Sequence, residues 1–170
     1  MKFTFETHYN AKTMTIMAKA LRKTIRKKHS RRSHIFGWLV IALGALFIFI
    51  EPTLDFRTIL TLAAVLILFA VLILEDRLNG FVAEKRLLAG TEKAVATFSE
   101  NSYISTTELG KTEWGYDKII MLAETADFFV FIFSKSHAQL YDKRSLQGGT
   151  PDDFRKFIEA VTGKQVQPIK

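Results

Sequence analysis

Two blocks of apolar residues lie close together near the start of the chain, and they restrict its fold more than any other feature. The blocks cover residues 35–50 and 59–74, and Thr61 is the only polar side chain in either. A sixteen-residue helix is about 24 Å long, so one more turn lets each block cross a hydrocarbon core of ~30 Å. Ser33 and His34 or residues 56–58 supply that turn. We therefore predict an α-helical transmembrane hairpin, residues 35–74, with spans at about 35–50 and 58–74.

Two other interpretations of these blocks fit less well. A helix at the surface of a soluble domain keeps a polar stripe, which both blocks lack. Burying two such helices on all sides needs a larger protein than 170 residues with one small domain. A cleaved signal peptide is not followed at once by a second span.

The positive charge is confined to one short stretch of the chain. Residues 1–34 hold ten Lys and Arg and one acid, whereas residues 75–170 hold thirteen basic and fourteen acidic residues. Seven of the Lys and Arg lie between Arg22 and Arg32, directly before the first span, and the loop 51–58 has one, Arg57. This bias predicts a multi-pass protein of the cell (inner) membrane, with both termini cytoplasmic and the loop outside. A specific nucleic-acid partner is not expected, because such binders spread their charge over a folded face.

Single residues refine the hairpin. Pro52 is expected to stop the first helix, and Trp38 to act as an interfacial anchor. Small residues seven apart, at Gly37 and Gly44 and in the second span at Ala63 and Ala70, predict close packing of two helices. We interpret this as the hairpin packing on itself, with homo-oligomer packing as the alternative.

The N-terminal region, residues 1–34, is predicted to form a strand over Lys2 to His8 and then a basic amphipathic helix capped by Asn10. Its apolar stripe consists of Met14, Met17, Ala18, Leu21 and Ile25. In one interpretation the stripe enters a membrane surface and the basic residues bind anionic lipid head groups. In the other, the stripe packs on the cytoplasmic domain and the charges only set topology. The candidate lipid contacts are Arg22, Lys23, Arg26, Lys27, Lys28, Arg31 and Arg32.

The C-terminal half is predicted to contain antiparallel strands closed by one helix. A helical connector spans residues 75–92, ending near Gly90. Strands are expected at 94–99, 102–109, 112–122, 128–134 and 138–143, with a two-residue turn at Gly110-Lys111 and a central, buried strand at 128–134. Thr150 caps a helix that ends at Gly163. Residues 93–163 therefore form a small α+β or mainly-β cytoplasmic domain, and 164–170 a tail.

The order of these parts resembles the bacterial YcxB-like family. The resemblance rests on TEWGYDKIIMLAETADFFVFIFSKSHAQLYDKRSL followed by TPDDFRKFIEAV, and Asp142 stands where the family often has proline before Lys143-Arg144. It implies a C-terminal domain of pleckstrin-homology-like (PH-like) fold, a bent antiparallel sheet closed by one helix. It implies no chemistry.

No catalytic, cofactor or metal site is predicted. The chain has no cysteine, and its four histidines lack ligand spacing. Ser134, Ser136 and His137 are interpreted as turn residues, and Gly148-Gly149 as a flexible lead into the last helix. A candidate partner or ligand surface comprises Trp114, Tyr116, Lys143 and Arg144.

Three functions fit this pattern. The preferred one is a non-enzymatic, membrane-anchored interaction or regulatory module that presents a PH-like domain at the cytoplasmic face. Its partners would be the lipid bilayer, anionic head groups, or another membrane or cytoplasmic protein. The alternatives are a small accessory subunit of a membrane transport complex and a membrane enzyme with an unrecognised site.

Overall fold

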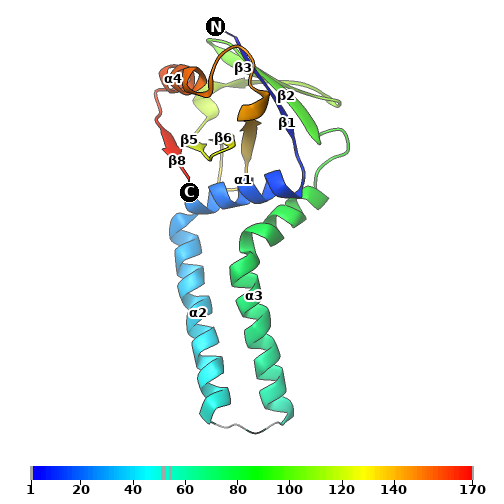
Figure 1. Ribbon diagram of the computed structural model, residues 1–170, viewed down its shortest axis with the longest axis vertical. Helices are drawn as coiled ribbons and strands as arrows, with labels where there is room; N and C mark the ends of the chain where they lie inside the picture. Colours follow the sequence, from blue (N-terminus) through cyan, green and yellow to red (C-terminus); the bar gives the residue numbers. More distant parts are fainter. Residues whose placement is uncertain (1, 51–52, 54, 170) are drawn as a thin grey trace.

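The computed structural model describes residues 2–50, 53 and 55–169 and consists of a long helical hairpin beneath a sheet-rich domain (Figure 1). The helices are α1 Ala11–Lys23, α2 Lys27–Ile50, α3 Phe56–Lys85 and α4 Pro151–Thr162. The strands are β1 Phe3–His8, β2 Lys93–Phe98, β3 Ser102–Thr107, β4 Gly110–Gly115, β5 Met121–Glu124, β6 Phe128–Ile132, β7 Ala138–Asp142 and β8 Val166–Pro168. Two short 3-10 helices, η1 Tyr116–Lys118 and η2 Lys143–Ser145, complete the described elements.

Helices α2 and α3 form the hairpin, and both are long and apolar enough to cross a membrane. They pack on each other, as predicted, along a stripe of α2 at alternating spacings of three and four residues: His34, Gly37, Ile41, Gly44 and Ile48. The predicted meeting of two small-residue stripes is wrong, because Ala63 and Ala70 are exposed. Instead the glycines of α2 accept branched side chains of α3. A Cβ at Gly37 would lie 2.8 Å from Leu72 Cδ1. The predicted stop at Pro52 lies outside the described residues.

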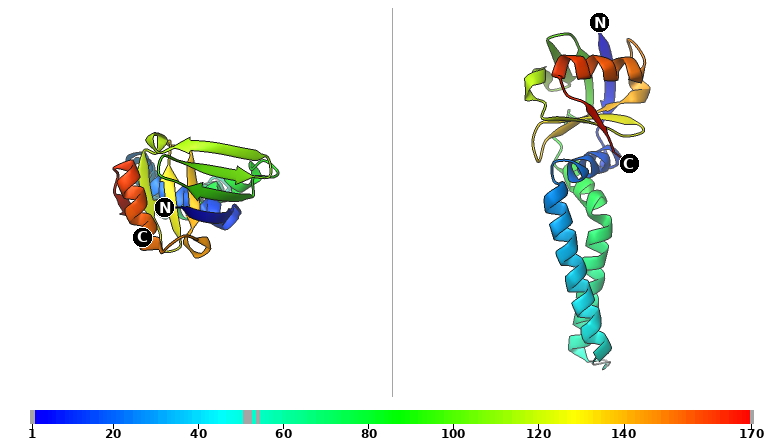
Figure 2. Two further views of the ribbon diagram at one scale, coloured as in Figure 1. Left: turned by 90° about the horizontal axis from the view of Figure 1, so that it is seen from above. Right: turned by 90° about the vertical axis from the view of Figure 1, so that its left-hand side faces the viewer.

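The upper domain contains two four-stranded sheets, in the orders β1-β2-β3-β4 and β7-β6-β5-β8 (Figure 2). The N-terminal strand joins the first sheet by antiparallel pairing with β2, with Phe5 opposite Ala96. The segment predicted as a tail contains β8, which pairs in parallel with β5, with Val166 opposite Leu122. The expected single antiparallel sheet is therefore two sheets, one with a parallel edge.

The predicted strand 112–122 is wrong, because the chain leaves one sheet and enters the other within it. Strand β4 ends at Gly115, η1 follows, and β5 begins at Met121. Tyr116 lies in η1 with its ring buried and its hydroxyl donating to the Ser99 carbonyl at 2.5 Å. This bond holds the corner between the sheets. The hairpin turn before β4 is also displaced from its predicted position, since Thr107 pairs with Gly110 and Glu108-Leu109 form the turn.

Strand β6 is apolar on both faces because it lies between two hydrophobic cores. All five of its residues are buried, and side chains alternate between opposite faces of a strand. Phe129 and Phe131 enter the core shared with the first sheet and α4, whereas Phe128, Val130 and Ile132 enter a second core against α1. The prediction of a central, buried strand is confirmed.

Helix α1 lies as a layer between the second sheet and the hairpin (Figure 1). Ala20 and Leu21 are buried against the β6–β7 side of that sheet, with Met17 and Ile25 packed beside them. The structure thus favours the second interpretation of the basic helix, in which its apolar stripe packs on the domain. Asn10 caps α1 as predicted, with Thr13 completing a capping box.

At the opposite end of the domain, α4 closes the core with the predicted boundaries, from the Thr150 N-cap to Gly163 in the left-handed conformation. Phe154 is fully buried and its ring lies 4.6 Å from Phe5 and 5.0 Å from Phe98. Gly148, predicted to be a flexible lead, is a point of close approach. Its φ is +98°, and a Cβ there would lie 2.2 Å from the Lys2 carbonyl oxygen.

Candidate functional site

Helix α1 is fastened to the last turns of α3 at three points that share one face of α3. Near one end of α1, Arg22 forms a two-bond ion pair with Asp76, Nε to Oδ1 at 2.6 Å and Nη2 to Oδ2 at 2.5 Å. In the middle, Gly80 lies against Thr15, leaving no room for a Cβ. At the other end, the backbone N–H of Ala11 donates to Glu84 at 2.9 Å. Residues 76, 80 and 84 are one helical turn apart, so α3 offers α1 a continuous face.

The same ion network reaches the other arm of the hairpin. Glu75 Oε2 on α3 accepts a 2.6 Å hydrogen bond from His34 Nε2 on α2, and it lies 3.8 Å from Arg22 Nε. Arg22 therefore links α1 to α3 directly and to α2 through Glu75. These polar contacts tie three helices together where the apolar part of the hairpin begins, which holds the sheet domain in one position on it.

A sharp turn between α1 and α2 brings their basic ends together. Helix α1 ends when Thr24 leaves the helical conformation, with φ −109° and ψ −99°. The Thr24 hydroxyl donates to the Ala20 carbonyl at 2.7 Å, and the neighbouring Ile25 packs into the core beneath the sheet. Three residues later α2 starts at Lys27 in a new direction (Figure 1). The basic stretch thus becomes a corner rather than one continuous helix.

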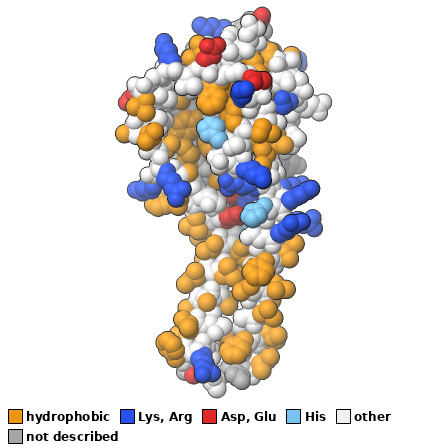
Figure 3. All heavy atoms as spheres, turned by 180° about the vertical axis from the view of Figure 1, so that it is seen from behind, with side chains coloured by type: hydrophobic (Ala, Val, Ile, Leu, Met, Phe, Trp, Pro, Cys, Tyr) orange, Lys and Arg blue, Asp and Glu red, His pale blue; other side chains and the backbone are white. Residues whose placement is uncertain are grey.

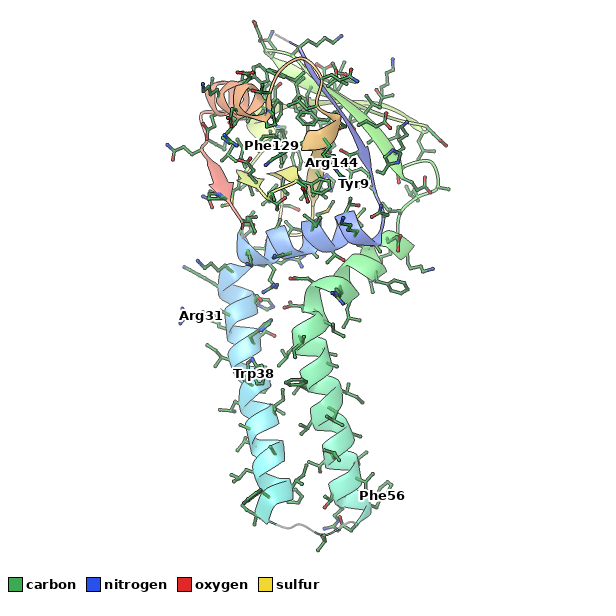
Figure 4. The ribbon with its side chains drawn as sticks, in the orientation of Figure 1. Tyr9, Arg31, Trp38, Phe56, Phe129 and Arg144 are labelled. Atoms are coloured by element: carbon green, nitrogen blue, oxygen red, sulfur yellow. The ribbon has the colours of Figure 1, made fainter. Side chains whose placement is uncertain are left out.

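This corner encloses a groove of about 640 Å³, hereafter the basic groove. One wall is the face of α2 that carries Lys27, Arg31 and Trp38, four and seven residues apart. Arg22 and Lys23 close the groove at α1, and the C-terminal residues 167–169, in and after β8, form the opposite wall. In Figure 4, Arg31 projects from α2 near the sheet domain, and Trp38 lies further down the hairpin.

The basic groove has a graded lining, cationic near the sheet domain and apolar toward the hairpin. Its lining residues include Arg22, Lys23, Lys27, Arg31 and His34, and none is acidic. Ile35 and Trp38 continue the same wall into the apolar surface of α2. Figure 3 shows this arrangement from behind, with Lys and Arg gathered at the junction above a hydrophobic stem.

The seven cations predicted as lipid contacts fall into separate groups. Four of them, Arg22, Lys23, Lys27 and Arg31, line the basic groove. Lys28 and Arg32 are exposed on α2 but do not line it. Arg26 turns the other way, and its Nε donates to the Lys135 carbonyl at 2.6 Å. Only part of the predicted set therefore shares one site.

The second predicted surface does not form. Trp114 is half-buried, with its ring 5.0 Å from Phe133 and 5.8 Å from His137. Tyr116 is a core residue, and Arg144 is exposed and paired with Asp142 at 2.6 Å. These side chains point into the core or pair with neighbours in their own segment instead of gathering into a binding face.

Lys143, the fourth member of that predicted surface, is engaged inside the domain. Its Nζ lies 2.5 Å from Glu124 Oε1 and 2.6 Å from the Thr125 carbonyl, and 5.0 Å from the Phe129 ring centre. Burial alone would raise the pKa of Glu124. Hydrogen bonds from Arg155 and Lys143 outweigh it and lower that pKa below its usual value. This cluster joins β5, η2 and α4 and is structural.

The Ser134, Ser136 and His137 segment is a turn, as interpreted from the sequence. Ser134 Oγ accepts from the backbone N–H groups of Ser136 and His137 at 3.2 and 3.0 Å. Burial beside Trp114 lowers the pKa of His137. Within the part of the chain that the structure describes, no three His, Cys, Asp or Glu side chains are grouped to hold a metal ion.

Several residues of the junction are absent from the predicted site. His34 is assigned from sequence only to a helix extension, and Glu75 and Asp76 only to a connector. Gln167, Pro168 and Ile169 fall in the predicted tail. One signal was present in the sequence: Glu75-Asp76 directly follows an apolar block, where unpaired acids are costly near hydrocarbon.

Comparison with known proteins gives one match. The family model described as YcxB-like protein matches residues 98–158, which run from the end of β2 to Ile158 in α4. This confirms the resemblance over most of the sheet domain, and the hairpin lies outside the matched part. No curated protein and no solved structure matches the chain.

Proposed function

With residues 98–158 identified as a YcxB-like region, we propose that this protein is a membrane-anchored, non-enzymatic interaction or regulatory module. The hairpin crosses the membrane twice, and both termini and the sheet domain lie on the cytoplasmic side. The observation that carries the proposal is the way α1 docks the domain on the hairpin. The sheet covers the apolar stripe of α1. The other side of α1 is held to the hairpin by Arg22 of α1 and by Gly80 and Glu84 of α3.

The surface of the hairpin supports the membrane part of this proposal. Apolar side chains cover its outside, with Phe49 87% and Phe36 67% exposed. Contiguous apolar surface of this extent is rare on soluble monomers, since water penalises it, and hydrocarbon removes that cost. The cationic band at the junction supports the cytoplasmic position of the domain.

The sheet domain is proposed to be PH-like. Two sheets share the aromatic core with the closing helix α4, and β1 from the far end of the chain completes the first sheet. Strand β8 ends beside α2 at the basic groove, and β1 leads directly into α1. A module of this kind presents a fixed surface at the membrane, because α1 packs on the sheet domain and is also held to the hairpin.

Membrane topology can be tested with single cysteines, since the chain has none of its own. Thr53→Cys lies between the spans and Lys111→Cys lies on β4 of the sheet domain, and both positions are exposed. In intact cells a membrane-impermeant maleimide should label Thr53→Cys from outside, and Lys111→Cys only after lysis. Labelling of Lys111→Cys in intact cells, or full release of the protein by alkaline carbonate, would refute the anchored arrangement.

The interaction role needs a separate test. A photo-crosslinking residue placed at Lys111 should give a discrete partner band in cells. This band should disappear when Gly80→Ala undocks α1, and with it the domain, from the hairpin. A crosslinking pattern unchanged by undocking, or turnover of a substrate that depends on His137 in a folded protein, would contradict a non-enzymatic docking module.

A further inference from the structure

We propose that the basic groove is a binding site for one anionic membrane lipid, whose phosphate lies between Lys27 and Arg31 and whose acyl chain follows α2 past Trp38. The inference rests on the membrane insertion of the hairpin proposed above. It goes beyond general attraction to a charged surface, because it assigns a defined site to a single lipid.

Two of the charges at the groove, those of Lys27 and Arg31, are available to a ligand. Arg22 is already committed to Asp76, and His34 to Glu75. Lys27 and Arg31 are exposed, and within the described residues neither forms an ion pair. Both lie in the first two turns of α2, which has no acidic residue in its first turn. The positive end of the helix dipole therefore adds to their field rather than being neutralised.

The shape of the groove favours a lipid over a free phosphate. Its cationic part opens toward Ile35 and Trp38, and from there the wall is the apolar exterior of α2. A phospholipid matches both halves, with an anionic head group above and an acyl chain below, whereas inorganic phosphate uses only the first. Trp38 also packs against Phe69 of α3, edge to face at 5.8 Å, which fixes its ring as part of the wall.

The third wall explains why the site is a groove and not an open surface. Residues 167–169 lie in and directly after β8. The parallel pairing of β8 with β5 holds them in place, and the Ile169 N–H donates to the Glu124 carbonyl at 2.7 Å. A head group entering between α2 and this segment would touch the hairpin and the sheet domain together. Lipid binding would thereby stabilise the docked arrangement of the two parts.

The chain offers a matched pair of variants for the test. Lys27→Gln with Arg31→Gln removes two positive charges from the groove wall. Lys28→Gln with Arg32→Gln removes two charges from the same turns of the same helix, at exposed positions outside the groove. Both pairs change net charge and topology signals equally, so a difference between them reports on the groove.

The readout is quenching of Trp38 by lipids with brominated acyl chains, with full-length protein reconstituted in vesicles. Trp114→Phe leaves Trp38 as the single tryptophan. Quenching by brominated phosphatidylglycerol is compared with quenching by brominated phosphatidylcholine. We expect the wild-type groove to prefer the anionic lipid, the groove pair to lose that preference by about tenfold or more, and the control pair to keep it.

Each outcome separates the two proposals. No quenching of Trp38 by either lipid means that the hairpin is not inserted, which refutes the proposed function itself. Equal quenching by both lipids in the wild-type protein, or equal losses in the two pairs, overturns the lipid site alone. Loss of the preference on adding glycerol phosphate or inorganic phosphate assigns the groove to a soluble phosphate and overturns the lipid assignment.

Discussion

Replacing Gly80 by alanine should undock α1 from α3 without disturbing the hairpin. A Cβ at this position would lie 2.4 Å from Thr15 Oγ1 and 2.5 Å from Thr15 N. These atoms cannot give way, because the nitrogen is backbone and the hydroxyl donates to the Ala11 carbonyl at 2.7 Å. Ordinary van der Waals contact begins at 3.4 Å and the shorter contact is 2.4 Å, so α1 must retreat by about 1.0 Å.

Overpacking of a well-packed contact typically costs about 1–3 kcal/mol of stability, and we expect a loss of this size in the free energy of docking. A rigid shift of α1 by that distance would also lengthen the 2.6 Å Arg22–Asp76 bond beyond the range of about 2.7–2.9 Å for a charge-assisted hydrogen bond. The gain of up to about 1 kcal/mol from replacing a helical glycine by alanine does not offset this loss. The helix-propensity gain stabilises α3 equally in the docked and undocked states, so it does not change the docking free energy.

Hydrogen exchange of the α1 amides in lipid nanodiscs measures docking directly. An undocking free energy lowered by 1–3 kcal/mol should speed their exchange about 5- to 150-fold, with α2 amides unchanged. Gly37→Ala is the matched control, since its Cβ would meet only the flexible end of Leu72, at 2.8 Å. Unchanged α1 exchange in Gly80→Ala, or equal acceleration in Gly37→Ala, would refute the docking model.

Three further predictions concern the sheet domain, each measured by denaturant unfolding of the full-length protein in detergent. Phe154→Ala should cost about 3–5 kcal/mol, because it empties the centre of the aromatic core, and no loss would contradict the core assignment. Gly148→Ala should destabilise by about 1–3 kcal/mol through the Lys2 carbonyl, whereas Gly110→Ala, with nothing within 4 Å of its Cβ, should suffer only from its positive φ. The folded-state pKa of Glu124 is lowered, so its stabilisation is present above the usual pH of about 4.5 and is lost as pH falls through the folded value. Glu124→Gln should therefore be less stable by about 1–3 kcal/mol at neutral pH and should flatten the acid limb of the stability profile, which an unaltered profile would disprove.

Local chemistry determined the parts of the fold that the sequence predicts well. Thr150, Pro151, Asp153 and Gly163 each act within one turn of their own position, so the boundaries of α4 are encoded locally. The two apolar faces of β6 are also encoded locally. Successive side chains point to opposite faces of a strand, so an unbroken apolar run indicates that both faces are buried.

Features that depend on distant partners were not accessible in this way. Nothing near residues 166–168 indicates a strand, since β8 is stabilised by its parallel pairing with β5, more than forty residues earlier. The strand predicted over 112–122 is divided by a corner at Tyr116–Lys118. The corner is set by the buried Tyr116 and its bond to Ser99, which are tertiary contacts.

The candidate site shows the same limit most clearly. A continuous helix through the basic stretch would set all seven cations around one axis and enclose nothing. The break at Thr24 divides them, so that Lys27 and Arg31 face Arg22 across a groove while Lys28 and Arg32 face away. That break depends on Ile25 entering the core beneath the sheet, which the chain completes only after more than a hundred further residues have folded. Charge composition therefore predicts that a basic site exists, but the sheet domain decides which of the charges belong to it.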